Sequence, residues 1–380
     1  MLKNEVAGAL AGVRVIDASR VLGGPVAGQI LGDHGAHVIK VEGPEGDDTR
    51  KWGPPYLGKN SAYFSGANRN KSGMTLDLNS EVGRDQFFAL LESADVLIEN
   101  FKESTLAKWG IEVSTFTNRF PRLVHCRVSG FGSDGPYGGL PAYDTAMQAL
   151  CGLMSVNGDQ QSGALRVGLP IVDMTTGLNA VIGVLLALQH RERTGMGQLV
   201  ETTLYANALS MLHPHAPNYF ATGQCPIQTG NAHPNIYPYD SFQTENGHLY
   251  LAIGNDSQFS MFCHHVGLSE LPADPRFATN PKRSENRDTL RDLLSPVLAG
   301  LDGKMLALDL MRKGVPCSPV NTVEEALLDP HTAHMGMVVE MEGGYKGLGS
   351  PIKLSRSPAS YRYSPPEKTE LVKEGSWQRN

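Results

Sequence analysis

The chain has 380 residues, enough for two or three domains with substantial cores. It carries 33 basic and 39 acidic residues, and the resulting formal net charge of −6 argues against nucleic acid or an anionic membrane as a partner. Its apolar runs are shorter than the roughly 18 residues that a membrane span requires, and residues 1–5 lack a signal peptide's apolar core. The composition predicts a soluble cytoplasmic protein.

The cysteine and histidine residues are too scattered to indicate a disulfide framework or a metal site. An odd number of cysteines lies far apart along the chain, at Cys126, Cys151, Cys225, Cys263 and Cys317. The histidines at 213, 215, 264 and 265 have no further ligand residues at metal-site spacing, so we interpret them as structural. We therefore expect reduced thiols and no metal.

The N-terminal segment predicts a βαβ unit. Residues 13–17 and 37–41 have the composition of buried strands, and a turn and a short helix at 26–33 lie between them. Glu42 follows the second strand where dinucleotide-binding units carry a ribose-binding acid, so an NAD site has to be considered. Pro25, however, occupies the place of the middle glycine of G-x-G-x-x-G, where the backbone would approach a pyrophosphate. The glycine pattern therefore disfavours a dinucleotide.

Strands continue to alternate with helices through the next hundred residues, which indicates a doubly wound α/β sheet. Arg69 and Lys71 stand just before a predicted strand at 74–78, where they form either a phosphate site or a solvated basic turn. Asn100, Phe101 and Lys102 follow a strand at 95–98. Ligands bind at the carboxyl ends of parallel strands, so these three residues are candidates for a site.

The most informative stretch is residues 168–178, which places Asp173 just ahead of an apolar helix at 174–190. The apolar residues surround this predicted helix almost completely, as expected of a buried helix. Asp173 can cap the helix through its free amides. The same amides and the helix dipole would lower the pKa of this carboxyl and keep it ionised and nucleophilic. The two interpretations are compatible.

A change in composition near Pro214 predicts a second domain. We expect a large α/β domain from residues 1–213 and 331–380, and a smaller α+β domain with linkers from residues 214–330. The tail after Met335, rich in glycine, proline and serine, is expected to pack back on the large domain.

Taken together, the motifs resemble the class III CoA-transferases, the family of formyl-CoA and carnitine-CoA transferases. The resemblance covers nearly the whole chain, and the joint order of its motifs is highly specific. The matching segments are GVRVID at 12–17, NRNKS at 68–72, LDL at 76–78, ENF at 99–101, SGFG at 129–132, PIVDMTTG at 170–177, RERTGMG at 191–197 and GNAHP at 230–234.

The resemblance implies that Asp173 is the catalytic aspartate and that several segments bind coenzyme A. Lys108 stands where relatives often carry arginine, and Gly43 stands where some carry a phosphate-binding arginine. Our hypothesis is that Arg69 and Lys71 compensate. The CoA-binding positions implied in addition are Leu22, Gly23, Leu76, Asp77, Leu78, Asn79, Asn100, Phe101, Lys102, Lys108, Pro141, Ala142, Tyr143 and Asp144.

The resemblance also implies the chemistry, in which CoA is transferred by way of an aspartyl mixed anhydride and an aspartyl-CoA thioester. CoA thioesters are then the substrates, and no permanently bound cofactor is expected. Turns around Gly132 and Gly230 are candidates for oxyanion stabilisation. The loop containing Gly230, Asn231 and His233 is expected to shield intermediates. His233 could bind a second carboxylate, which favours a small dicarboxylic acid.

Two other functions remain open. A racemase of 2-methylacyl-CoA thioesters with the same fold would need a base on each face of the reacting carbon, and those relatives carry histidine before the aspartate that matches Asp144. Here that residue is Tyr143, and a phenol is a poor base at neutral pH. A non-catalytic CoA-binding protein is the other alternative, and the intact Asp173 argues against it. The resemblance further implies an interlocked homodimer with each active site between the large domain and the partner's small domain.

Overall fold

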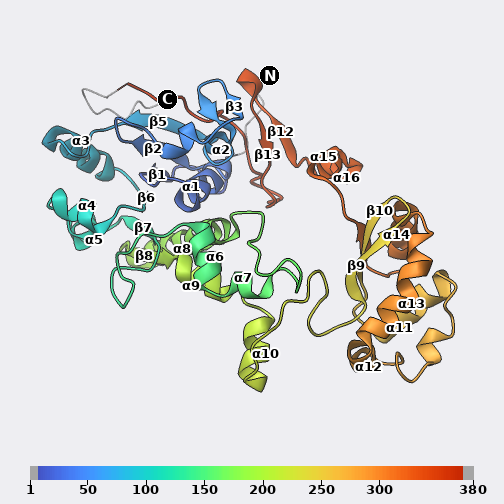
Figure 1. Cartoon of the computed structure of the whole chain (residues 1–380). Helices are drawn as coiled ribbons and strands as arrows, with labels where there is room; N and C mark the ends of the chain where they lie inside the picture. The colour runs from blue at the N-terminus through green and yellow to red at the C-terminus, as the bar shows by residue number, and fades with distance from the viewer. Residues whose placement is uncertain (1–6, 371–380) are drawn as a thin grey trace. The chain divides into compact units, whose positions relative to one another are not determined.

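The computed structural model describes residues 7–370, which divide into two compact units (Figure 1). The first unit comprises residues 7–153, 166–214 and 330–370, and the second comprises 154–165 and 215–329. The division differs from the predicted one at 154–165. This segment belongs to the second unit, because Gly158 accepts the Gly230 amide at 2.8 Å and the Asn157 carbonyl accepts Gln228 Nε2 at 2.9 Å.

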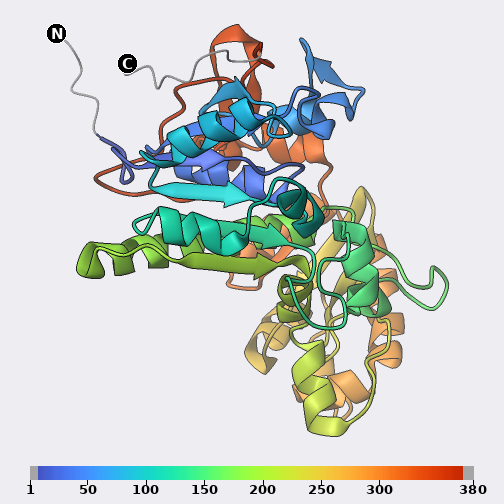
Figure 2. The ribbon, with the colours of Figure 1, turned by 90° about the vertical axis from the view of Figure 1, so that its left-hand side faces the viewer.

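A six-stranded parallel sheet organises the first unit, in the order β5-β2-β1-β6-β7-β8 (Figures 1 and 2). The doubly wound α/β prediction is confirmed for this unit. Strand β5 begins three residues earlier than predicted and contains Lys71. It also ends three residues earlier, because residues 77–80 form a turn closed by the Asp77 side chain. The strands are β1 (Arg14–Asp17), β2 (His37–Glu42), β5 (Lys71–Thr75), β6 (Val96–Glu99), β7 (Val124–Ser129) and β8 (Leu199–Thr203).

Alternate strand residues feed two separate cores, as the two-residue period of a strand requires. Val15 and Val96 pack with α1 (Gly23–Asp33), α6 (Asp144–Leu150), α8 (Ile171–Thr194) and α9 (Leu204–Ser210). Ile16 and Leu97 pack on the opposite face with α3 (Glu81–Leu91), α4 (Glu103–Lys108) and α5 (Val113–Arg119). Both faces of the sheet are therefore covered, which explains the continuous apolar runs of the strands.

Helix α8 is buried on one side only, so the prediction of burial all round is wrong for the single chain. Val172, Ala180 and Val184 are fully buried against the sheet, whereas Ile182 is 53% and Leu186 67% exposed. Gly177 permits close packing on α1, because a Cβ there would lie 2.6 Å from the Gly23 carbonyl oxygen. By length and composition alone, α8 is apolar enough to cross a membrane, but half of that stretch is buried within this fold.

The C-terminal segment of the first unit lies along the edge strand β5. The Asn70 amide donates to the Tyr363 carbonyl at 2.8 Å, and Thr75 Oγ1 donates to the Thr369 carbonyl at 2.8 Å. Arg362 donates to the carbonyls of Gly32 and Ala36 at the end of α1. A hairpin of β12 (Val338–Glu340) and β13 (Lys346–Leu348) precedes this segment. The shorter elements of this unit are η1 (Asp48–Lys51), β3 (Tyr56–Leu57), β4 (Asn60–Ser61), α2 (Ala62–Ser65), α16 (Pro330–Met335) and η3 (Glu342–Gly344).

The second unit is a small α+β structure with its own core. Its antiparallel sheet has the order β11-β10-β9, and Phe242, Leu249, Phe259 and Leu294 are buried in its core. The strands are β9 (Tyr239–Thr244), β10 (Gly247–Ala252) and β11 (Cys317–Pro319). The helices are α10 (His215–Thr222), α11 (Asp256–His265), η2 (Leu271–Ala273), α12 (Asn280–Glu285), α13 (Arg287–Ala299), α14 (Gly303–Arg312) and α15 (Val323–Leu328), while α7 (Leu153–Val156) lies at the unit boundary.

Candidate active site

The strand order of the parallel sheet reverses between β1 and β6, and open α/β sheets bind ligands at such a point. The segments after these two strands are tied together there. The Arg20 amide donates to Asn100 Oδ1 at 3.0 Å, and Asn100 Nδ2 donates to the Arg20 carbonyl at 2.9 Å. The indole of Trp109 donates to Asn79 Oδ1 at 3.2 Å. Parts of three predicted CoA-binding segments are thus brought to one edge of the sheet.

Val21 at this edge has a strained backbone that sequence reasoning missed. Its φ is +73°, a conformation rarely adopted by a β-branched residue. The Val21 amide donates to the Asp47 carboxylate at 3.2 Å, and Asp47 in turn pairs with the buried Lys40 at 3.2 Å. The Lys40 ammonium and the Thr49 hydrogen bonds lower the pKa of Asp47 against the opposing effect of burial. The Asp47 carboxylate, bonded to Lys40 and Thr49, therefore holds the strained turn ahead of Leu22 and Gly23.

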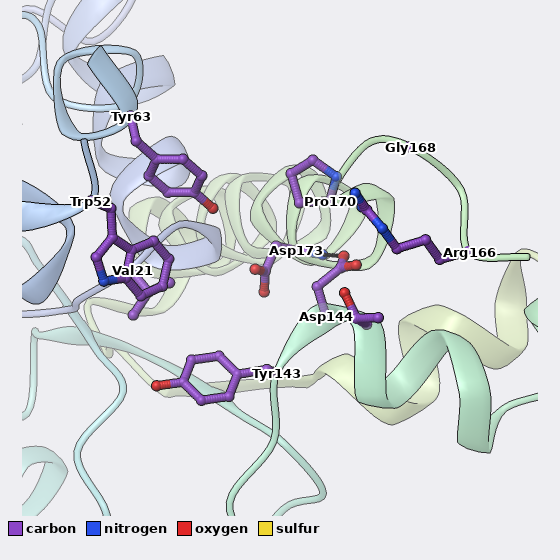
Figure 3. Close-up of a pocket in the computed structure, with 10 residues that line it drawn as sticks. Val21, Trp52, Tyr63, Tyr143, Asp144, Arg166, Gly168, Pro170 and Asp173 are labelled. Carbon is purple, nitrogen blue, oxygen red and sulfur yellow. Dashed lines mark hydrogen bonds between the residues drawn. The ribbon is translucent and has the colours of Figure 1, made fainter. Parts of the chain in front are cut away.

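A cavity of about 380 Å³ opens beside this turn, within the size range of small-molecule sites (Figure 3). It contains three predicted residues, Asp173, Asp144 and Tyr143. Sequence reasoning missed Trp52 and Tyr63, which follow from no periodic pattern, and Arg166, which stands two residues before the singled-out stretch. The lining residues are Val21, Trp52, Tyr63, Tyr143, Asp144, Thr145, Arg166, Gly168, Pro170 and Asp173.

Asp144, not Asp173, caps helix α8. Helix α8 begins at Ile171, three residues earlier than predicted, so Asp173 lies inside its first turn and not just ahead of it, and is only 9% exposed. The Asp144 carboxylate accepts the amides of Val172 at 2.7 Å and Asp173 at 3.0 Å. Buried Gln148 donates to the other oxygen of Asp144 at 2.6 Å. The predicted capping role of Asp173 is therefore wrong, because a carboxylate from α6 already occupies those amides.

The pKa of Asp173 is raised to about 7, by burial first and by the neighbouring Asp144 carboxylate second. The prediction of a lowered pKa is therefore also wrong. The amides that would have stabilised an ionised Asp173 are bonded to a second negative charge, which disfavours its ionisation. The pKa of Tyr63 is raised to about 12, mainly by burial and secondly by the negative charge of Asp173. This phenol is therefore a neutral hydrogen-bond donor beside the carboxylates.

Arg69 and Lys71 are corrected as candidates for a phosphate site, because both are buried and paired inside the fold. Arg69 is 3% exposed and forms a two-pronged ion pair with Asp33 at 2.6 and 2.9 Å. Lys71 is 2% exposed and donates to Asp17, the Pro25 carbonyl and Asn68 at 2.7 to 2.8 Å. Through these contacts the two cations hold α1 against β5. The alternative prediction, a solvated basic turn, is therefore wrong as well.

The other predicted CoA positions differ in accessibility. Leu22, Gly23, Leu76 and Leu78 are buried, so only their backbone could meet a ligand. Asp77, Phe101 and Ala142 are partly exposed, and the Phe101 ring lies 5.2 Å from that of Trp109. The exposed side chains are those of Asn79, Lys102, Lys108 and Pro141. Their contact with coenzyme A stays a prediction.

The loop with Gly230, Asn231 and His233 belongs to the second unit. The Gly230 amide is bonded to Gly158, and the Gly132 amide in the first unit to Ser129 Oγ at 3.0 Å, so these two amides are not available as oxyanion donors. The Asn231 carbonyl accepts the Tyr250 hydroxyl at 2.6 Å, and His233 Nδ1 accepts the Asn235 amide at 3.0 Å. Over residues 7–370 no group of three or more histidine, cysteine or acidic residues has the arrangement of a metal site.

Comparison with known proteins identifies the family. Residues 10–370 match the model of CoA-transferase family III. The chain is 38% identical over 369 residues to succinate–glutarate CoA-transferase from Agrobacterium fabrum, covering 94% of this chain and 92% of the relative. It is 38% identical over 347 residues to acetyl-CoA:oxalate CoA-transferase from Acetobacter aceti, covering 90% and 88% of the two chains.

A solved structure of a CaiB/BaiF family protein from Brucella suis has the same architecture. It superimposes with a TM-score of 0.86 at 39% identity, covering 95% of this chain and 97% of the other. The family match, the two relatives and this structure each extend over nearly the whole chain. The chain therefore belongs to CoA-transferase family III and is an enzyme of that class.

Proposed function

We propose that this enzyme transfers CoA from an acyl-CoA to a small dicarboxylic acid through covalent intermediates on Asp173. The observation that carries the proposal is the buried Asp173 carboxylate at the wall of a small-molecule cavity in a family III chain. The other carboxylate of this cavity, Asp144, is engaged by two α8 amides and by Gln148. The names of the two relatives specify succinate, glutarate and oxalate, which supports a dicarboxylic acid for this chain.

The proposed reaction begins when ionised Asp173 attacks the thioester carbonyl carbon and the carbon–sulfur bond breaks. The products are an aspartyl anhydride and CoA thiolate. The thiolate then attacks the aspartyl carbonyl, which releases the donor acid and leaves an aspartyl-CoA thioester. The acceptor carboxylate displaces CoA thiolate from Asp173, and the thiolate finally attacks the acceptor's acyl carbon. Asp173 leaves as the free carboxylate. Coenzyme A thioesters take part as substrates, and the proposed reaction needs no permanently bound cofactor.

Burial supports this role, because it strips water from the Asp173 carboxylate. Asp144 accepts the backbone amide of Asp173 and so fixes the helical turn from which the Asp173 side chain projects. The Tyr63 hydroxyl reaches the same cavity as a neutral donor that can meet a substrate carboxylate. A pKa near 7 leaves a large fraction of Asp173 ionised in neutral buffer.

The panel experiment that tests the function pairs several acyl-CoA donors with free acids and separates the CoA esters by chromatography. We expect a new dicarboxylyl-CoA that forms only when donor and acid are both present. Solvent deuterium entering a 2-methylacyl-CoA without any transfer would instead indicate the racemase. Stoichiometric binding of CoA esters without turnover of any pair would indicate a binding protein.

The pH profile should respond to Asp144. In the native enzyme we expect kcat/KM to rise with pH and level off above about 7, as Asp173 ionises. Asp144→Asn removes the neighbouring negative charge and therefore lowers the pKa of Asp173, so the rising limb should move roughly one unit to lower pH. Asparagine keeps one oxygen that can accept an α8 amide.

The pH comparison uses identical substrates for both proteins, so the ionisation of coenzyme A itself cancels. Glu192→Gln serves as the control, because Glu192 is an exposed acid near the far end of α8, about 29 Å along the helix from Asp173. Coincident rising limbs for native enzyme and Asp144→Asn would refute the electrostatic coupling.

We also propose that the chain works in the cytoplasm as an interlocked homodimer. The exposed apolar face of α8, with Leu178, Ile182 and Leu186 each at least 49% exposed, supports burial against a second copy. We propose that the remaining predicted CoA positions contact coenzyme A and that the loop at residues 230–234 shields the intermediates. That His233 binds a second carboxylate is a separate hypothesis. It is tested by replacing His233 and measuring the Michaelis constants of the enzyme for the acids.

Ile182→Glu should disrupt this assembly, because an unpaired carboxylate within a buried apolar interface costs several kcal/mol. Sedimentation velocity is expected to show monomer or loss of soluble protein, in contrast to a native dimer. Val82→Glu is the matched control, since Val82 is 65% exposed on α3, on the opposite face of the sheet. A dimer of unchanged stability in Ile182→Glu would exclude this face as the interface.

A further inference from the structure

The cavity beside Asp173 is lined by more acidic than basic side chains, although the proposed substrates are anions. Two of its lining residues are the aspartates 144 and 173. Within the described chain, Arg166 is the only basic residue among those that line it. A dicarboxylate entering here meets like charges unless its second carboxylate is directed to a cation, so the position of Arg166 decides which acids can be held.

The guanidinium of Arg166 is available for a ligand. Its side chain is exposed and lies beside Pro170 and the two aspartates (Figure 3). Its Nη1 atom donates a long hydrogen bond of 3.4 Å to the Val167 carbonyl. In residues 7–370 it forms no ion pair with an acidic side chain. A guanidinium without a carboxylate partner keeps the fork of donors that binds a carboxylate through two hydrogen bonds.

The backbone that carries Arg166 is held in place by a buried glutamine. Gln148 is fully buried, and its Oε1 accepts the Val167 amide at 2.8 Å while its Nε2 donates to the Leu169 carbonyl at 3.3 Å. The same amide group donates to Asp144. One buried glutamine thus fixes the backbone next to Arg166 relative to the carboxylate that caps the Asp173 helix.

We propose that Arg166 binds the second carboxylate of a dicarboxylic acceptor while the first carboxylate reacts at Asp173, an inference that rests on the proposed function. Arg166 is then a specificity-determining residue that selects dicarboxylic acids over monocarboxylic acids of the same length. The reacting carboxylate does not depend on Arg166, so a monocarboxylic acid loses little when the guanidinium is removed. A bidentate ion pair requires the planar fork, so lysine can replace only part of it.

The test compares glutarate with pentanoate, two five-carbon acids, at a saturating concentration of a monocarboxylyl-CoA donor that the native enzyme uses. In Arg166→Gln we expect kcat/KM for glutarate to fall roughly 30- to 100-fold, the effect of a lost charge-assisted hydrogen bond, and that for pentanoate to change less than about threefold. Arg166→Lys should recover part of the loss. The KM for the donor and the yield of adduct at Asp173 should stay at native values.

The control is Arg193→Gln, because Arg193 is an exposed arginine on α8 about 30 Å along the helix from Asp173. Equal losses for both acids, or a raised KM for the CoA donor alone, would overturn the assignment; the second result would place a CoA phosphate on Arg166. A native enzyme that transfers CoA to no acid of the panel refutes the proposed function together with this role. If another dicarboxylic acid is the acceptor, that acid and the monocarboxylic acid of the same length replace glutarate and pentanoate. A native enzyme that is active on glutarate, with an unaffected Arg166→Gln, refutes the role of Arg166 alone.

Discussion

Asp173→Asn is expected to abolish both CoA transfer and the covalent adduct. Asparagine preserves the shape and burial of the side chain but cannot attack a thioester carbonyl, so kcat should fall by at least about 10⁴-fold. Intact-mass spectrometry after incubation with an acyl-CoA should show a donor-dependent mass increase in the native enzyme, mapped to Asp173 and removed by hydroxylamine. The variant should show none.

Glu192→Gln, with an acid changed near the other end of the same helix, should form the adduct at the native rate. An Asp173→Asn protein that folds and transfers CoA within tenfold of the native rate would rule out the aspartyl mechanism. An adduct mapped to another residue would do the same while leaving the transferase activity itself intact.

Lys71→Met should lower the free energy of unfolding of the first unit by about 3–5 kcal/mol. The buried ammonium has three partners, and its removal leaves Asp17 as an uncompensated charge with only Ser19 and nearby Lys40 for support. Burial lowers the pKa of Lys71 to about 8, so the ion pair is still present at pH 7. Chemical denaturation followed by tryptophan fluorescence suits this measurement, because Trp52 and Trp109 both lie in the first unit.

Lys59→Met provides the matched control, because the side chain of Lys59 is 86% exposed and its ion pair with Glu367 is long, at 3.7 Å. We expect a change within about 0.5 kcal/mol there. A Lys71→Met protein as stable as the native enzyme but with weakened CoA binding would restore the phosphate-site hypothesis for this residue.

The sequence was sufficient where local pattern determines structure. Strands that alternate with helices predicted the parallel sheet, and the apolar helix predicted that Asp173 lies at a helix N-terminus, because periodicity is a property of short stretches. The pKa of Asp173 could not be predicted in this way. It depends on Asp144, which is 29 residues away in the chain and occupies the same helix end.

The local sequence pattern also could not predict whether a charged residue is buried or exposed. Arg69 and Lys71 sit next to a strand in the sequence, but their partners Asp33 and Asp17 lie 36 and 54 residues away. Whether a cation near a strand faces solvent or an internal acid is decided by tertiary packing. Trp52 and Tyr63 were missed for a related reason, since their segment has no periodicity that would assign either ring to a cavity.

Because the C-terminal segment covers β5, the edge of this strand stays uncovered during much of translation. Asn70 binds the backbone of Tyr363, a separation of 293 residues. At a translation rate of roughly 5–20 residues per second, the ribosome adds that length in about 15–60 s. During this interval the whole second unit is synthesised while the outer edge of β5 lacks its covering segment. An exposed strand edge pairs readily with other chains. The nascent chain is therefore most vulnerable to aggregation before residues 363–369 emerge, and a truncation that removes these residues would make that vulnerability permanent.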